Sequence, residues 1–186
     1  MVRLFTGIKL DLTDELSGYR SQLIESLRQS IITWVDPEKL HITLHFFGDV
    51  DESEVAHITE LHKKAASVIR PFEIDYERTG FFGQGRQPKI IWFGFQSSGE
   101  LDLLHGSLVK ELEAGGYHSD RKNFHPHLTL GRVKNMKDTD HFRKCLDRIN
   151  QQKSHSSFRI KTFMLIKSIL KQSGPEYTTL EEFKLR

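Results

Sequence analysis

Hydrophobic residues recur along this chain with two alternating periods, which predict strands and helices in turn. Alternation of apolar and polar residues predicts seven strands, over 2–10, 40–47, 72–78, 89–96, 124–133, 157–166 and 177–185. Apolar stripes with the helical period predict four helices, over 14–31, 51–69, 100–114 and 138–149. Asp51, with Glu54 three residues later, has the spacing of a capping box at the start of the second helix. The predicted order is therefore β-α-β-α-β, followed by the same order again.

The repeated order predicts an α+β fold made of two duplicated βαβαβ halves. Related halves usually pack around an approximate two-fold axis, which would place a cleft between them. The glycine-rich segment 80–88 is the one candidate for an internal boundary, giving lobes of approximately 1–80 and 88–186. A chain of 186 residues is short for two full domains. We therefore expect a single domain, 1–186, with two intertwined lobes and pseudo-two-fold symmetry.

A short motif, His-apolar-Thr-apolar, occurs on the middle strand of each half, as HITL (41–44) and as HLTL (127–130). Side chains alternate along a strand, so residues two apart share a face. The first copy is therefore expected to present three polar side chains on one face, those of His41, Thr43 and His45. The second copy is expected to do the same with His125, His127 and Thr129. Packing of the halves would bring imidazoles and hydroxyls from both copies into the cleft.

A pair of imidazoles is suited to acid–base chemistry on a phosphodiester, because one can be neutral while the other is protonated near neutral pH. Hydroxyl groups on the same strand face can hold the phosphoryl oxygens. Arg132 could meet the developing negative charge. Strict alternation puts Arg132 on the opposite face from Thr129, so this role requires Gly131 to bend or end the strand.

Five blocks of the sequence resemble the 2H phosphoesterase superfamily, and within it the RNA 2′,3′-cyclic phosphodiesterases, also called 2′-5′ RNA ligases. In chain order these blocks are RLFTGIKL, LHITLHFFGDV, GFFGQGRQPKIIWFGF, FHPHLTLGRV and the closing SIL…GPEYTTLEEFKL. The resemblance covers essentially the whole chain and implies a bilobal α+β fold around a cleft. It implies that His41 and His127 are catalytic. The chain departs from the family pattern at Lys89, where many relatives have Arg, and at His45.

The resemblance further implies that Thr43, Thr129 and Arg132 bind the phosphate of the substrate. The implied reaction opens the 2′,3′-cyclic end of an RNA to a 2′-phosphomonoester without a metal or other cofactor. The same groups would serve the reverse reaction, 2′-5′ RNA ligation. An RNA or oligonucleotide with a 2′,3′-cyclic phosphate end is accordingly the expected partner.

Two alternative functions are open at this point. A zinc site could use the histidines near the two strands, although no Cys or carboxylate joins them at a ligand spacing. A binding module of the same fold could hold a nucleotide or RNA end without turnover. Among the aromatic residues, Phe47 or Phe82 could stack a nucleobase, whereas Phe46 is expected in the core.

We expect an ordinary cytoplasmic monomer, with the remaining histidines at its surface. Six histidines are expected at the surface: His57, His62, His105, His118, His141 and His155. The one cysteine, Cys145, is expected to be a buried filler, and a single cysteine excludes an intramolecular disulfide. A formal charge of +2 is too small to indicate a general nucleic-acid coat. No apolar run is long enough for a membrane span or a signal-peptide core.

Overall fold

The computed structural model describes residues 1–85, 87–96, 99–118, 124–172 and 174–186. The elements in these residues are, in chain order, β1 (Val2–Lys9), α1 (Asp14–Ser26), β2 (Ile31–Trp34), the 3₁₀ helix η1 (Pro37–Lys39), β3 (His41–Val50), α2 (Glu54–Ala66), β4 (Phe72–Gln84), β5 (Gln87–Phe95), α3 (Gly99–Ala114), β6 (His127–Asn135), α4 (Thr139–Asn150), β7 (Ser157–Ile160), β8 (Thr162–Lys171) and β9 (Gly174–Lys184). The order β-α-β-α-β occurs twice, as β1-α1-β3-α2-β4 and as β5-α3-β6-α4-β8. The α+β class and the duplicated order predicted from the sequence are confirmed.

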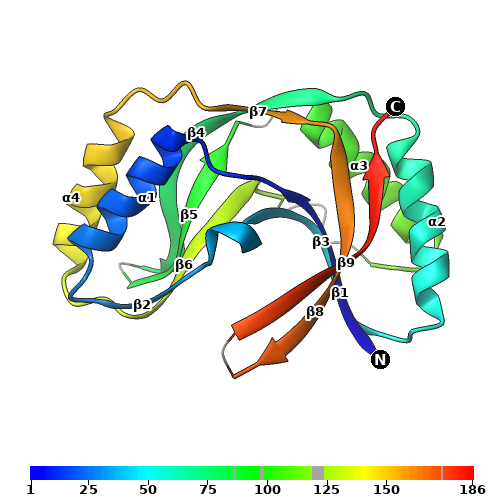
Figure 1. Ribbon diagram of the computed structural model, residues 1–186, viewed down its shortest axis with the longest axis horizontal. Helices are drawn as coiled ribbons and strands as arrows, with labels where there is room; N and C mark the ends of the chain where they lie inside the picture. Colours follow the sequence, from blue (N-terminus) through cyan, green and yellow to red (C-terminus); the bar gives the residue numbers. More distant parts are fainter. Residues whose placement is uncertain (86, 97–98, 119–123, 173) are drawn as a thin grey trace.

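The strands form one curled sheet in the order β7-β4-β5-β6-β3-β1-β8-β9, with β2 also paired to β6. The two motif strands, β3 and β6, meet at its centre and are antiparallel, with Ile42 opposite Leu128. We call the strands β2, β4, β5 and β6 with helices α1 and α4 the β6 lobe, and the strands β1, β3, β8 and β9 with α2 and α3 the β3 lobe. Figure 1 shows the first pair of helices on the left and the second on the right. Each lobe therefore takes one helix from each half of the sequence.

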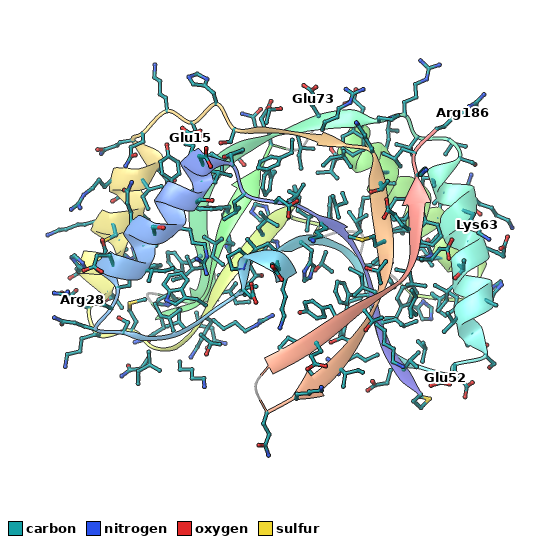
Figure 2. The ribbon with its side chains drawn as sticks, viewed as in Figure 1. Glu15, Arg28, Glu52, Lys63, Glu73 and Arg186 are labelled. Carbon is teal, nitrogen blue, oxygen red and sulfur yellow. The ribbon has the colours of Figure 1, made fainter. Side chains whose placement is uncertain are left out.

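Helices pack on the sheet through the apolar stripes that the sequence predicts. The four leucines of the predicted stripe in α3 are buried, namely Leu101, Leu104, Leu108 and Leu112. Charged residues lie on the opposite faces, as Figure 2 shows for Lys63 on α2, which points away from the sheet. No helix in the described parts of the chain is long and apolar enough to span a membrane.

The first predicted helix is too long. Helix α1 ends at Ser26, and residues 31–34, the first of which falls within the predicted helix, form strand β2. This strand pairs with β6, so that Trp34 lies opposite Gly131. The backbone hydrogen bonds between β2 and β6 outweigh the helical preference of the local pattern, because they satisfy backbone N–H and C=O groups at the side of the cleft. The sequence pattern gave no separate signal for a strand of four residues.

The segment predicted as an internal boundary is a β-hairpin. Strand β4 continues to Gln84 and pairs with β5 from Gln87 onward. The glycines permit this pairing by allowing close approach, since a Cβ at Gly80 would lie 2.3 Å from Cη2 of Trp92. The segment therefore lies within the β6 lobe, and the predicted loop between lobes at 80–88 is wrong.

Three smaller features also bear on the sequence prediction. Asp51 does not cap α2; its Oδ1 accepts hydrogen bonds from Ser53 N and Oγ, and Ser53 precedes the helix. The predicted strand 157–166 is divided between β7, which pairs with β4, and β8, which pairs with β1 and β9. The last strand, β9, lies at the sheet edge as predicted.

Two histidines that were predicted at the surface are buried. His62 is fully buried in α2, where Nδ1 lies 2.7 Å from the carbonyl oxygen of Ile58 and Nε2 lies 2.7 Å from Thr6 Oγ1. Burial lowers the pKa of His62 to about 4, so the ring is neutral in the folded protein at neutral pH. His105 is also buried. A helical position alone does not show which face a histidine occupies. Cys145 is buried, as predicted.

Candidate active site

The two motif histidines are held in the same way on their two strands. Nδ1 of His41 lies 2.8 Å from the carbonyl oxygen of Lys39, and Nδ1 of His127 lies 2.7 Å from the carbonyl oxygen of His125. In both cases the acceptor is the residue two positions earlier. Because a carbonyl oxygen only accepts, Nδ1 of each ring must donate its proton. Each Nε2 is therefore the nitrogen that can take up or release a proton.

Aromatic rings fix the orientation of each imidazole. The ring of His41 lies 4.7 Å from Phe5 and 5.4 Å from Tyr177, measured between ring centroids. The ring of His127 lies 4.9 Å from Phe82, perpendicular to it, and 6.4 Å from Trp92. These contacts leave little freedom for either ring to rotate, so each Nε2 has a defined direction.

Gly7 of β1 leaves the space that His41 occupies. It pairs with Thr43, and a Cβ at Gly7 would lie 3.0 Å from the carbonyl oxygen of Ile42 and 3.4 Å from Cδ2 of His41. A larger residue would press on the motif strand and displace the imidazole. The sequence carried no signal for this role.

Burial lowers the pKa of both histidines. For His41, burial is the largest cause, the carbonyl of Lys39 partly offsets it, and the charges of His127 and Arg132 lower the pKa further. For His127, burial again dominates, opposed by the carbonyl of His125 and reinforced by the charges of His125 and Arg132. The two histidines belong to one site, because Ile42, which follows His41, lies opposite Leu128, which follows His127. A bound phosphate would oppose these shifts by stabilising the imidazolium form.

Arg132 lies on the same side of β6 as Thr129, as its predicted role requires. In the pairing of β6 with β5, Thr129 is opposite Trp92 and Gly131 is opposite Ile91, so Leu130 is an extra residue in β6. This β-bulge resets the alternation of side chains. Thr129 and Arg132 consequently line the same cavity. The predicted bend is confirmed, although the extra residue is Leu130 rather than Gly131.

An equivalent bulge in β3 turns His45 away from the strand face that alternation predicts, and His45 packs in the protein interior instead. Thr43 pairs with Gly7 and His45 pairs with Thr6, so Leu44 is the extra residue. His45 therefore turns away from His41 and Thr43 and is only 7% exposed. Its ring packs 4.4 Å from that of Phe47. Burial lowers its pKa to about 4, and the charge of His105 contributes.

The cavity beside the motifs has a volume of about 320 Å³ and contains four of the five predicted site residues. Its lining consists of Thr33, Trp34, Val35, Asp36, Lys39, His41, Thr43, Thr129, Arg132, Gly174, Pro175 and Tyr177. The fifth predicted residue, His127, precedes Thr129 on the same strand face. Trp34 and Tyr177 were missed from the sequence. They come from β2, which was not predicted, and from the hairpin of β8 and β9, whose reach over the cleft is set by tertiary structure.

The two aromatic residues suggested for base stacking, Phe47 and Phe82, lie on different sides of the sheet. Phe47 packs against His45 and, at 5.5 Å, against Tyr117, so it lies on the helix side of the sheet rather than in the cleft. The suggestion for Phe47 is wrong. Phe82 lies beside His127 on the cleft side.

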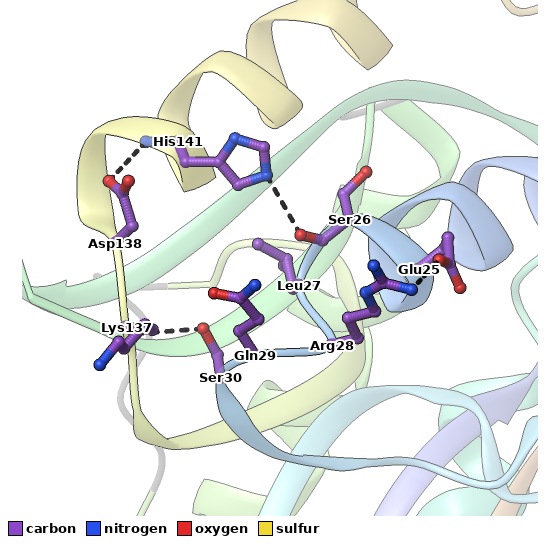
Figure 3. A pocket seen from close by; sticks show the side chains of 9 residues that line it. All are labelled: Glu25, Ser26, Leu27, Arg28, Gln29, Ser30, Lys137, Asp138 and His141. Carbon is purple, nitrogen blue, oxygen red and sulfur yellow. Dashed lines mark hydrogen bonds and ion pairs between the residues drawn. The ribbon is translucent and has the colours of Figure 1, made fainter.

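A second cavity, of about 450 Å³, lies between the end of α1 and the start of α4 (Figure 3). Several of its polar groups are already paired. His141 Nε2 lies 3.1 Å from the carbonyl oxygen of Ser26, and Asp138 accepts from the backbone N–H of His141. None of the predicted site residues lines it. Across the described ranges, no group of three or more His, Cys, Asp and Glu side chains is placed to hold a metal ion.

Comparison with known proteins identifies the family. Residues 15–171 match the model of the 2′-5′ RNA ligase superfamily. An RNA 2′,3′-cyclic phosphodiesterase of Methanothermobacter thermautotrophicus is 33% identical over 186 residues, covering 99% of both chains. The crystal structure of TT0787 of Thermus thermophilus superposes with a TM-score of 0.72 and 29% identity, covering 99% of this chain and 98% of that one. The structure of E. coli LigT complexed with 3′-AMP has a TM-score of 0.69 and 22% identity, covering 99% and 98%. The chain belongs to the 2′-5′ RNA ligase superfamily.

Proposed function

We propose that this protein hydrolyses the 2′,3′-cyclic phosphodiester at an RNA end to a 2′-phosphomonoester, with His41 and His127 as its acid–base pair. The observation that carries the proposal is the matched pair of imidazoles, each with Nδ1 held by the carbonyl two residues earlier. Two such rings beside one cavity provide a proton donor and a proton acceptor of the same chemical type. The relative from M. thermautotrophicus is named as an RNA 2′,3′-cyclic phosphodiesterase, which supports the proposed substrate.

In the proposed reaction one neutral imidazole takes a proton from water through Nε2. The oxygen of that water forms a bond to phosphorus while the bond from phosphorus to O3′ breaks. The second imidazole, initially protonated, gives its Nε2 proton to O3′. The product is a 2′-phosphate with a free 3′-hydroxyl, and the two histidines have exchanged protonation states. We assign His41 as the acid and His127 as the base.

Three further side chains are proposed to hold the phosphate. The hydroxyls of Thr43 and Thr129 donate to its non-bridging oxygens, and each lies two residues after a motif histidine on the same strand face. Arg132 supplies a fixed positive charge at the same cavity. These donors are in place before the reaction, so they can stabilise the charge that develops on the phosphoryl oxygens without reorganising.

The same groups would also catalyse joining. If a 5′-hydroxyl replaces water, its proton passes to the base and its oxygen bonds to phosphorus, and a 2′-5′ linkage forms as O3′ leaves. We propose that neither direction uses a metal, because the histidines, the threonine hydroxyls and Arg132 together meet the charge of the phosphate.

Product analysis tests the proposed function. A 5′-labelled oligonucleotide with a 2′,3′-cyclic phosphate is incubated with the protein, and the 2′- and 3′-phosphate products are separated by chromatography. We expect the 2′-phosphate, formed equally well in the presence of EDTA.

Three other results would contradict this account in different ways. Mainly 3′-phosphate would mean that O2′ is the leaving oxygen. Tight binding of the oligonucleotide without turnover would indicate a binding module. Activity that EDTA removes and zinc restores would assign the histidines to a metal site.

A further inference from the structure

The equivalence of the two motif strands is broken at one position. The bulges at Leu44 and Leu130 are equivalent, so the residue two positions after each bulge returns to the cleft side. In β6 that residue is Arg132. In β3 it is Phe46. A site that is otherwise doubled therefore has a cation on one strand and an aromatic ring on the other.

The strand register places Phe46 on the same side as the catalytic groups. Thr43 pairs with Gly7 and Phe46 pairs with Phe5, and Phe5 packs against the ring of His41. Because Gly7 and Phe5 are two residues apart on β1, Thr43 and Phe46 are about 7 Å apart along the sheet. Phe46 is thus the next side chain after Thr43 on the cleft side of β3.

Phe46 is exposed, although the sequence pattern predicted it in the core. It is 53% exposed, whereas the apolar residues Ile42 and Leu44 of the same strand are buried. The guanidinium carbon of Arg3 lies 5.0 Å from the centroid of its ring, and Arg3 Nη1 lies 3.9 Å from Asp49 Oδ2. The site therefore combines an accessible aromatic ring with a cation, the pairing with which proteins hold single-stranded nucleotides.

The antiparallel pairing of β3 and β6 places Phe46 beyond Thr43, next to the cavity and on its His127 side. With Ile42 opposite Leu128, the direction from Thr43 to Phe46 leads away from His41 and past His127. The cavity with Trp34, Arg132 and Tyr177 lies at the His41 end. The cavity thus offers an enclosed space, and Phe46 beside it offers an open ring.

A cyclic RNA end has one nucleoside attached to its phosphate, whereas a 2′-5′ linkage has a nucleoside on each side. We propose that Phe46, with Arg3, forms a second nucleoside subsite that stacks the base of the nucleoside supplying the 5′-oxygen. This inference rests on the proposed function. The nucleoside that carries the 2′- and 3′-oxygens occupies the part of the cavity lined by Trp34 and Tyr177. The phosphate, held by Thr43, Thr129 and Arg132, lies between this nucleoside and Phe46. The 5′-oxygen, or the water that replaces it, then lies on the His127 side, which suits His127 as the base.

The chemical steps at this subsite need no further reactant. In joining, the 5′-hydroxyl loses its proton to His127, its oxygen bonds to phosphorus, and O3′ leaves with a proton from His41. In cleavage of a 2′-5′ linkage, the 3′-hydroxyl gives its proton to His41 as its oxygen bonds to phosphorus, and the bond from phosphorus to the 5′-oxygen breaks as that oxygen takes a proton from His127. The cyclic phosphate and the 2′-5′ linkage are interconverted without any net oxidation or nucleotide cofactor.

The test compares two substrates with the same enzyme samples. One is a nucleoside 2′,3′-cyclic phosphate, which has no second nucleoside, and the other is a 2′-5′-linked dinucleotide. Phe46→Ala should lower kcat/KM for the dinucleotide roughly 5- to 150-fold more than for the cyclic mononucleotide, the worth of one base–aromatic stack. Phe46→Trp should retain the ratio of the wild type. Leu103→Ala, which removes a similarly exposed apolar side chain of α3, should change neither value.

A second experiment removes from the substrate the base that is proposed to stack on Phe46. A dinucleotide that lacks the base of its 5′-oxygen nucleoside should be a poor substrate for the wild type, and Phe46→Ala should add little further loss. Equal losses of Phe46→Ala on both original substrates would overturn the subsite, as would a wild type that hydrolyses the cyclic mononucleotide but neither cleaves nor forms the 2′-5′ linkage. A wild type inactive on the cyclic mononucleotide would instead remove the proposed function, and this inference with it.

Discussion

His41→Ala and His127→Ala should each lower turnover of a cyclic-ended oligonucleotide by about 10²–10⁴-fold, the usual contribution of a positioned proton-transfer group. Each imidazole is oriented by a carbonyl and by aromatic rings, so its Nε2 has a fixed position that a truncated side chain cannot supply. The double variant should be little worse than the poorer single variant, because the acid and the base act in one step.

Single-turnover rates measured at saturating enzyme would test this expectation without interference from weakened binding. His155→Ala is a suitable control, because it removes an exposed histidine outside the cleft. A His41→Ala enzyme with a nearly normal rate would show that the doubled motif serves only the architecture of the sheet.

Arg132→Ala should lower kcat/KM about 10- to 150-fold, because a charge-assisted hydrogen bond contributes about 1.5–3 kcal/mol. The loss should be similar for all four terminal bases, since the guanidinium is proposed to contact the phosphate. Lys134→Ala is a matched control, because it removes an exposed cation from the same strand. A large change in base preference, measured with four oligonucleotides that differ only in the terminal base, would place Arg132 in base recognition instead.

The motif strands β3 and β6 show how far alternation can be used to predict a site. Alternation correctly put His41 with Thr43 and His127 with Thr129. It failed at His45 and Phe46, because a bulge at Leu44 reverses the faces of the residues that follow it, up to the second register shift between Phe46 and Gly48. The equivalent bend before Arg132 could be anticipated, since Gly131 is a residue that tolerates irregular backbone. Leu44 and His45 carry no such signal, so only the pairing with β1 determines their faces.

Features that depend on contacts between distant segments were not predictable from local pattern. Strand β2 exists because it pairs with β6, and it brings Trp34 to the cavity. The glycines in the segment 80–88 predict a loop, whereas Gly80 makes room for Trp92 on the paired strand. His62 is predicted at the surface of a helix, whereas its hydrogen bond to Thr6 connects α2 to β1 in the core.

The central claim is that the motif is doubled because the reaction needs an acid and a base at once. Its most direct test is the pH dependence of kcat/KM on a cyclic-ended oligonucleotide, for the wild type and both single variants, with and without EDTA.

Burial lowers the pKa of both histidines below the ordinary value of 6.5 in the free enzyme. The base must be neutral, so activity falls at pH values below its pKa; the acid must be protonated, so activity falls above its pKa. We expect a bell-shaped profile with its optimum below pH 6.5, unchanged by EDTA. His41→Ala should flatten the alkaline limb and His127→Ala the acid limb. Both limbs persisting in both variants would contradict the acid–base pair.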